Sequence, residues 1–259
     1  MAILLDDASS QYLVATGALA YGSTPMTFAC WFRSNDGTIA QTIMSMANTL
    51  GFSEFSLRAR GDLAGDPLQA RAMDEVSEAV AATTTGYTAN TWHHGCAVFD
   101  SSTSRTAYID GANSANNTTS KTPSGINSFA IGRNNDQTPG AYVSGDVAEA
   151  AIWSATLTDA QVASLATGIS PLLVRAENLE NYWSILGNNS ASGEIDVIAR
   201  YALTWTGSPT KSAHPRMKYQ HRRQARKMTT AAAAAGGMAR LINGGLLQGG
   251  KLLGGGRVL

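Results

Sequence analysis

The chain has few cysteines, no long apolar run and no acidic residue near its end. Only Cys30 and Cys96 occur among 259 residues, too few for a disulfide scaffold. Both lie in apolar, strand-like segments, so we expect reduced thiols packed in the core. No run of about 18 apolar residues is present, which predicts no membrane span. Residues 1–7 lack the basic and apolar parts of a signal peptide, so we expect synthesis in the cytoplasm without secretion.

Acidic residues are absent from positions 211–259, which carry ten Lys or Arg. Residues 1–210 carry the other nine Lys or Arg and all 19 Asp and Glu. The net charge of zero is therefore the sum of a negatively charged part and a positively charged part. The length and the 44% hydrophobic share suffice for one large β domain. The sequence therefore predicts an acidic domain over residues 1–210 and a basic tail over residues 211–259.

Short runs of alternating apolar and polar residues fill the first 155 positions, separated by clusters of Gly, Asn, Asp and Ser. Residues 26–33 place Met26, Phe28, Cys30 and Phe32 on one face of a strand. Similar runs lie at residues 42–45, 54–60, 68–73, 79–84, 92–100, 104–109, 129–131 and 147–153. Many short strands at this spacing predict a two-sheet sandwich.

Local signals add a hairpin turn, a helix and closing strands. Asp110-Gly111 is typical of a hairpin turn because glycine accepts positive φ. Thr158 and Gln161 form a capping box, and Gly168 is a stop signal, so a helix is predicted over 158–167. Residues 180–206 return to strand character, whereas residues 66–82 fit either strands or a helix.

Several motifs in sequence order resemble the laminin G-like jelly rolls of the concanavalin A-like lectin and glucanase superfamily. They are Trp92-His93-His94, Tyr108-Ile109-Asp110-Gly111, the run GDVAEAAIW at 145–153 and LTDAQV at 157–162. The resemblance covers about residues 8–206 and implies an all-β, two-sheet antiparallel jelly roll (concanavalin A-like). Together with the helix signal at 158–167 and the composition of residues 211–259, the predicted fold has one short helix and an extended C-terminal tail. The resemblance also favours strands over a helix at 66–82.

Members of this superfamily include sugar-binding modules, glycosidases, adhesion domains and virion proteins, so function has to be argued from sites. Residues 193–199 (GEIDVIA) look like the catalytic strand of laminarinase-type glycosidases. Glu194 and Asp196 match its first two acidic positions, but Ile198, or Ala199 after a bulge, takes the third. Because a retaining mechanism needs carboxyls with distinct protonation roles, the sequence predicts no enzyme and no catalytic residue.

No metal or other cofactor is assigned from the sequence. Some members of the superfamily bind calcium at loops, and four residues suggest such a site, although asparagine and aspartate are also common in turns: Asn134, Asn135, Asp136 and Asp146. His93 and His94 are neighbours on a strand and point to opposite faces, so we expect one packed and one exposed rather than a metal pair. The five tryptophans are expected mostly in the core.

The tail combines a basic stretch with a repeat of paired leucines and glycines. Clustered Lys and Arg can bind nucleic acid or an acidic protein surface by releasing counterions, and we favour the protein surface. The predicted partner-binding residues are Arg222, Arg223, Arg226, Lys227, Leu246, Leu247, Leu252 and Leu253.

These features together lead to two functional hypotheses. The first is a structural subunit of a tailed-phage virion, in the capsid decoration or in the tail and adsorption apparatus, as the resemblance implies. Its partners would be other virion proteins and further copies of the chain, with host glycans as an additional ligand and no membrane or nucleic acid. The alternative is a carbohydrate-binding, lectin-like module outside a virion, using loops such as 133–140.

Overall fold

The computed structural model describes residues 1–16, 21–185, 193–198 and 201–219. Two compact units are distinguished, Met1–Met217 and Lys218–Leu259. The second unit has only Lys218 and Tyr219 described, both exposed. The sequence suggested a boundary after residue 210, whereas the first unit continues to Met217.

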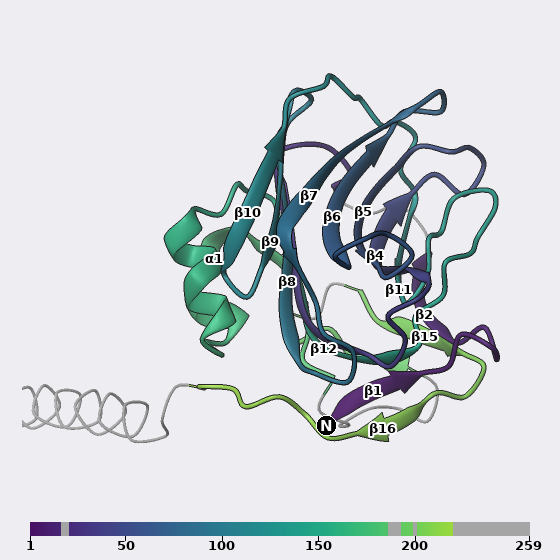
Figure 1. Cartoon of the computed structure of the whole chain (residues 1–259), viewed down its shortest axis with the longest axis vertical. Helices are drawn as coiled ribbons and strands as arrows, with labels where there is room; N and C mark the ends of the chain where they lie inside the picture. Colours follow the sequence, from purple (N-terminus) through teal and green to yellow (C-terminus); the bar gives the residue numbers. More distant parts are fainter. Residues whose placement is uncertain (17–20, 186–192, 199–200, 220–259) are drawn as a thin grey trace, which may run out of the picture. The chain divides into compact units, whose positions relative to one another are not determined.

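The first unit is a sandwich of two antiparallel sheets (Figure 1). Sheet A contains, in spatial order, β10 (Ala112–Asn117), β9 (Ser104–Ile109), β8 (His93–Ser101), β3 (Met26–Ser34), β12 (Gly145–Trp153), β1 (Ala2–Leu5) and β16 (Thr210–Ser212), with β13 (Leu179–Trp183) also paired to β12. Sheet B contains β14 (Gly193–Glu194), β15 (Leu203–Thr206), β2 (Tyr12–Thr16), β11 (Ser128–Ile131), β4 (Ala40–Ala47), β5 (Glu54–Arg60), β6 (Pro67–Met73) and β7 (Glu78–Gly86).

The main core lies between the two sheets and is rich in aromatic side chains. Phe28 of sheet A packs edge-on against Phe99 and against Phe129 of sheet B, with ring centroids 5.5 and 6.3 Å apart. The Phe129 ring also stacks on Trp183, with centroids 5.0 Å apart. Such pairs add to the free energy gained by burying their area. The alternation that predicts the strands thus directs every second side chain into one core.

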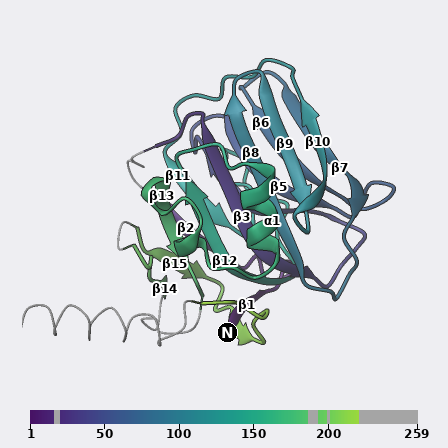
Figure 2. The same cartoon turned by 90° about the vertical axis from the view of Figure 1, so that its left-hand side faces the viewer.

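A second apolar cluster covers the outer face of sheet A. Helix α1 (Asp159–Ala166) lies in front of this sheet in Figure 2 and packs Val162 and Leu165 against Trp153 and Tyr182. The capping box predicted at its start is present, since Thr158 Oγ1 accepts from Gln161 N and Gln161 Oε1 accepts from Thr158 N. Two 3₁₀ turns follow, η1 (Pro171–Leu173) and η2 (Ala176–Asn178).

The fold class predicted from the sequence is confirmed, and most strand boundaries agree within about two residues. Residues 66–82 form strands β6 and β7, so the helical alternative is wrong. The sequence analysis missed β1 and β16, which are short and are stabilised by pairing with neighbouring strands. Cys30 and Cys96 are free and buried, as expected. No helix in the described part of the chain is long and apolar enough to cross a membrane.

Replacing Phe129 by alanine should strongly destabilise the sandwich. This side chain is 1% exposed and joins the rings of both sheets, so its removal leaves a cavity between them. We expect a loss of about 3–5 kcal/mol in the free energy of unfolding, measured by urea titration. The control is Val76→Ala, at a side chain 87% exposed, which should change stability by less than about 0.5 kcal/mol. Equal effects of the two changes would contradict this description of the core.

Candidate functional site

The two carboxylates suggested by the glycosidase resemblance both serve the structure. Asp196 accepts hydrogen bonds from Asn181 Nδ2 and from the backbone of Tyr182, Ile198 and Tyr201, so it ties a loop to β13. Glu194 is 1% exposed and pairs with Lys211. Both carboxylates are buried, Glu194 at 1% and Asp196 at 2% exposure, and the third position holds Ile198, which packs against the outer apolar cluster.

The two histidines are both buried, so the expectation that one would be exposed is wrong. His93 accepts from Thr88 N at Nε2 and therefore donates from Nδ1 to Asp110, over 2.8 Å. His94 points to the other face, where its ring lies edge-on to Trp31 with centroids 5.6 Å apart, and its Nδ1 has no hydrogen-bond partner among the described residues. Burial of His94 depends on α1 and η1, which lie over it and come from a distant part of the chain, so the sequence around His94 does not reveal it.

The residues suggested for calcium are divided between the two sheets. Asp146 lies on β12, where it pairs with Arg33 at 2.7 Å. Asn134, Asn135 and Asp136 lie in the segment between β11 and β12, and Asn134 bridges to Gly140. Within the described ranges, no group of three or more His, Cys, Asp or Glu is placed to hold a metal ion.

The tail residues predicted to bind partners all lie outside the described part of the chain. They are Arg222, Arg223, Arg226, Lys227, Leu246, Leu247, Leu252 and Leu253.

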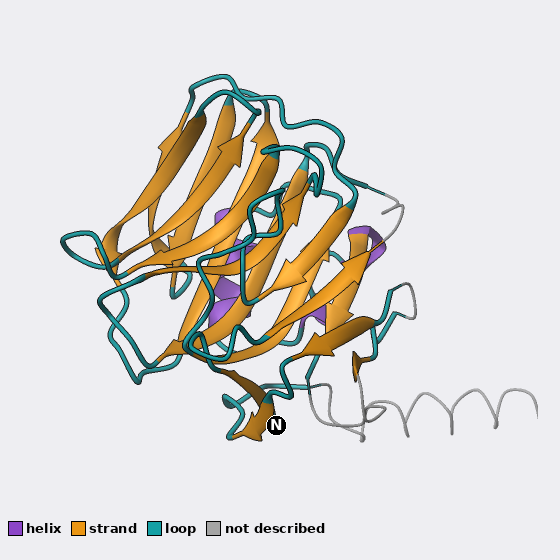
Figure 3. Ribbon diagram, turned by 90° about the vertical axis from the view of Figure 1, so that its right-hand side faces the viewer, coloured by secondary structure: helices purple, strands orange, loops and turns teal. Residues whose placement is uncertain are grey.

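A cluster of charges that was not anticipated lies on the outer face of sheet B, the sheet that faces the viewer in Figure 3. Phe55, Leu57 and Ala59 of β5 belong to the core, so the alternate residues of this strand point outward. Members of the cluster come from three neighbouring strands and are Glu54, Arg58, Arg60, Arg71 and Glu78. We call this set the sheet B charge cluster.

Arg71 is the best-paired cation of the cluster. Its Nη1 lies 3.1 Å from Glu54 and its Nε 2.5 Å from Glu78. Arg60 pairs with Asp62 and also donates to Gln69. Arg58, between them, has only Glu78 at 3.9 Å, and its Nε has no hydrogen-bond partner in the described structure. Burial, followed by the charges of Arg71 and Arg60, lowers the pKa of Arg58, which identifies it as the least compensated cation of the face.

Buried polar atoms without partners surround Arg58. Thr42 of β4 lies directly opposite Arg58 in the β4–β5 pairing, and Ser56 lies two residues before Arg58 on β5. The Thr42 hydroxyl has no hydrogen-bond partner among the described residues, whereas the Ser56 hydroxyl lies within reach of Glu54 and acts against the effect of burial on the pKa of that carboxyl. Buried polar groups are normally paired with protein atoms or ordered water, so the described side chains leave hydrogen-bonding capacity unfilled at Thr42 and at Arg58 Nε.

The segment after β11 covers part of this face. The Arg133 carbonyl accepts from Ser45 Oγ at 2.9 Å, and Asn135 Nδ2 donates to Ser128, so residues 133–135 lie across the outer side of β4 and β11. The guanidinium of Arg133 stacks on Tyr12, 3.6 Å from its ring centroid. Burial raises the pKa of Asp136 and of Glu54, which indicates that the cover excludes water from both carboxyls.

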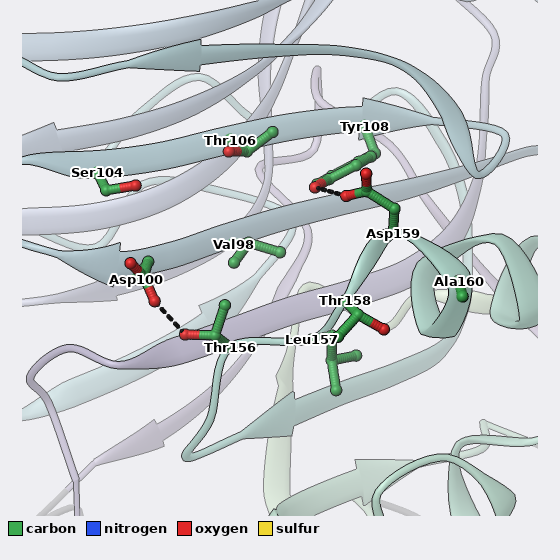
Figure 4. A pocket seen from close by; sticks show the side chains of 10 residues that line it. All are labelled: Val98, Asp100, Ser104, Thr106, Tyr108, Thr156, Leu157, Thr158, Asp159 and Ala160. Carbon is green, nitrogen blue, oxygen red and sulfur yellow. Dashed lines mark hydrogen bonds between the residues drawn. The ribbon is translucent and has the colours of Figure 1, made fainter.

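The outer face of sheet A carries a pocket of about 520 Å³ beside the start of α1 (Figure 4). Val98, Leu157 and Tyr108 are nearly buried and form its floor. Four of its polar side chains form two pairs: Tyr108 donates to Asp159 at 2.7 Å, and Thr156 donates to Asp100 at 2.6 Å. Burial, and then the hydrogen bond with Asp159, raises the pKa of Tyr108, which keeps this phenol a donor.

Comparison with known proteins establishes the family. The model of the concanavalin A-like lectin/glucanases superfamily matches residues 6–163, more than half of the chain. The chain belongs to this superfamily. The superfamily takes in both lectins and glucanases, so membership agrees with the fold and leaves the chemistry to the residues. The comparison with curated proteins finds no match.

Solved structures with a similar fold share low sequence identity with this chain. A Bacteroides ovatus protein, provisionally named as carbohydrate-binding, shares 17% identity with a TM-score of 0.61, over 84% of this chain and 61% of that one. Domain 4 of a Geobacillus stearothermophilus arabinanase, solved with arabinotriose, has 20% identity and a TM-score of 0.47, over 57% and 68% of the two chains. The chain spans less than two thirds of the Bacteroides protein, and at these identities the likeness concerns the fold.

The sequence analysis missed the sheet B charge cluster although its signal was present. The strand over residues 54–60 was predicted with the right bounds, and its outward positions read Glu54, Ser56, Arg58 and Arg60. An outward polar residue is ordinarily solvated. What the sequence could not show is that Arg71 lies beside them and that residues 133–135 cover part of the face.

The burial of His94 should make stability depend on pH. Burial lowers the pKa of His94 to about 4, below the value of about 6.5 expected in the unfolded chain. The unfolded chain therefore binds an additional proton between these values, so the free energy of unfolding should fall by up to about 3 kcal/mol as pH falls from about 6.5 to about 4. His94→Phe keeps the ring beside Trp31 and should remove most of this dependence in urea unfolding. The same slope in the variant would contradict the assignment.

Proposed function

We propose that this chain is a non-enzymatic, carbohydrate-binding jelly roll whose sheet B charge cluster binds an acidic saccharide. The observation that carries the proposal is the position of Arg58 between Arg60 and Arg71, without a close carboxylate of its own. The three side chains are 12–16% exposed, which leaves part of each guanidinium open to a ligand while holding it firmly against the sheet.

The chemistry of the face suits a sugar that bears a carboxylate or a sulfate. A guanidinium binds such a group through two parallel hydrogen bonds, and the interaction is stronger where water is partly excluded. The similar fold of the Bacteroides ovatus protein, provisionally named as carbohydrate-binding, is in keeping with this proposal.

The non-enzymatic part of the proposal rests on the carboxylates. Glycoside hydrolysis needs an acid and a second carboxylate, both reaching the glycosidic bond. Glu194 and Asp196 are held in structural contacts. Burial raises the pKa of Glu54, as a general acid requires, but this residue is 0% exposed and is bonded to Arg71. A substrate oxygen therefore has no path to it in this arrangement.

Replacing Arg58 by glutamine should weaken the binding of acidic saccharides. The change removes the least compensated cation, and we expect the dissociation constant to rise by about tenfold or more, since a charge-assisted hydrogen bond contributes about 1.5–3 kcal/mol. Calorimetry with acidic and matched neutral saccharides would measure it. The control is Arg216→Gln, which removes the same charge from an exposed position outside the cluster. Equal losses in the two variants, or no saccharide binding by the unaltered protein, would contradict the proposal.

We also propose, as a second function, that the protein is a structural subunit of a tailed-phage virion held there by its tail. The observation that favours this role is the composition of residues 218–259, which follow the sandwich unit and carry eight Lys or Arg, no acid and a Leu/Gly repeat. Such a segment suits docking on acidic and apolar surfaces of a partner. Saccharide binding by sheet B and docking through the tail are compatible in one subunit.

Ending the chain after Met217 tests this second function. All strands of the sandwich lie before this point, so the thermal unfolding of the shortened protein should be unchanged while its incorporation into particles is lost. A full-length variant with glutamine at Arg222, Arg223, Arg226 and Lys227 separates the role of charge from that of length. Normal incorporation of the shortened protein, measured by mass spectrometry of purified particles, would exclude anchoring by residues 218–259.

A further inference from the structure

The C-terminal segment of the first unit, residues 210–217, runs along the edge of sheet A and is called here the strap. Its first part is β16, which pairs antiparallel with β1 and brings Thr210 opposite Leu4. Without the strap, β1 would be an exposed edge strand, since β12 occupies only its other side. The strap therefore completes the sheet by strand addition.

Side chains of the strap meet three buried carboxylates of the sandwich. Lys211 pairs with Glu194, Ser212 donates to Asp146, and His214 Nε2 lies 3.1 Å from Glu149. The three acidic residues are 1%, 0% and 2% exposed. Each would lose a partner if the strap left, and a buried carboxylate that loses a partner is costly. The groove is thus selective for a segment that carries hydrogen-bond donors at this spacing.

The end of the strap is fitted to the outer face of sheet A. The Arg216 carbonyl lies 2.6 Å from where a Cβ of Gly168 would stand, a close approach that requires glycine. Met217 lines a small cavity on this face together with Trp31, His94, Leu165 and Ile169. The strap is therefore held by backbone pairing, by donors to carboxylates and by one apolar anchor, the combination found when peptides are recognised by strand addition.

The connection between the strap and the sandwich is short and strained. β15 ends at Thr206 and β16 begins at Thr210. Between them, Gly207 has φ +79° and Ser208 has φ +55°, a left-handed conformation that is unfavourable for a residue with a Cβ. A short hinge under strain favours exchange of the segment that follows it, because the strain is relieved when the hinge extends.

We propose that the strap is an exchangeable arm, so that in concentrated assemblies residues 210–217 of one copy occupy the groove of a second copy of this chain. The contacts in the groove are the same in both arrangements, so the balance depends on hinge strain and on the local concentration of copies. The free, undocked strap is disfavoured because it leaves the β1 edge and the three carboxylates uncovered. The proposal is independent of saccharide binding, which uses the other sheet.

Cysteine pairing in the full-length protein tests the exchange. One chain carries Leu4→Cys and a second, differing in mass, carries Thr210→Cys; the native Cys30 and Cys96 are buried. After the two are mixed at high concentration and oxidised, exchange should give a disulfide-linked dimer of unlike chains. A chain carrying both changes should form the bond within itself when dilute. If the dilute double variant closes its bond but the concentrated mixture yields no unlike dimer, the proposal is wrong; if the double variant forms no bond, the register itself is wrong.

Ser208→Gly provides the matched control for the hinge. Glycine adopts the left-handed conformation readily, so the arrangement with the strap docked on its own chain should become more stable. The yield of unlike dimer should then fall by roughly five- to tenfold. The groove contacts are untouched by this change, so intramolecular bonding in the double variant should persist. An unchanged yield of unlike dimer would mean that hinge strain does not drive the exchange and would overturn this part of the proposal.

Discussion

All nine residues of β12, from Gly145 to Trp153, are buried. The strand pairs with β3 along one side and with β1 and β13 along the other, so both of its faces and both of its edges are occupied. A bulge at Glu149, with φ +54°, places Val147, Ala150 and Ile152 in the main core and Ala151 and Trp153 in the outer cluster. Its two acidic residues, Asp146 and Glu149, have to be paired inside the protein, and Arg33, Tyr182 and the strap supply the partners.

Because β12 has to be covered on its outer side, the two outer faces of the sandwich differ in chemistry. On sheet A, α1, η1 and the strap lie over the outer face and form an apolar layer with it. On sheet B, the outer side of β5 and β6 carries arginines and carboxylates that are covered only in part, and several polar atoms there have no partner in the described structure. The partly covered charges of sheet B suit a ligand, whereas the contacts of sheet A with α1, η1 and the strap contribute to stability.

Residues of one type behave differently according to what lies over them. Arg105 is 1% exposed and donates to Asn117 and two carbonyls, so it fastens a loop. Arg58, on sheet B, is also mostly buried, with 15% of its side chain exposed. Its one ion pair among the described residues is with Glu78, at 3.9 Å. Glu194 and Asp196 resemble the start of a catalytic strand in sequence, yet both are taken up by structural contacts. The residue types at positions 194 and 196 resemble those of a catalytic strand, but the contacts made by Asn181 and Lys211 give both carboxylates a structural role.

The alternation of apolar residues, the capping box at Thr158 and the turn at Asp110-Gly111 determined the strands, the helix and the jelly-roll class from the sequence, because each depends on residues close together in the chain. Tertiary structure alone decided that His94 is buried, that Glu194 meets Lys211 and that Arg58, Arg60 and Arg71 share one face. The charge state and exposure of a polar side chain depend on the segment that covers it, and in this protein that segment comes from a distant part of the chain.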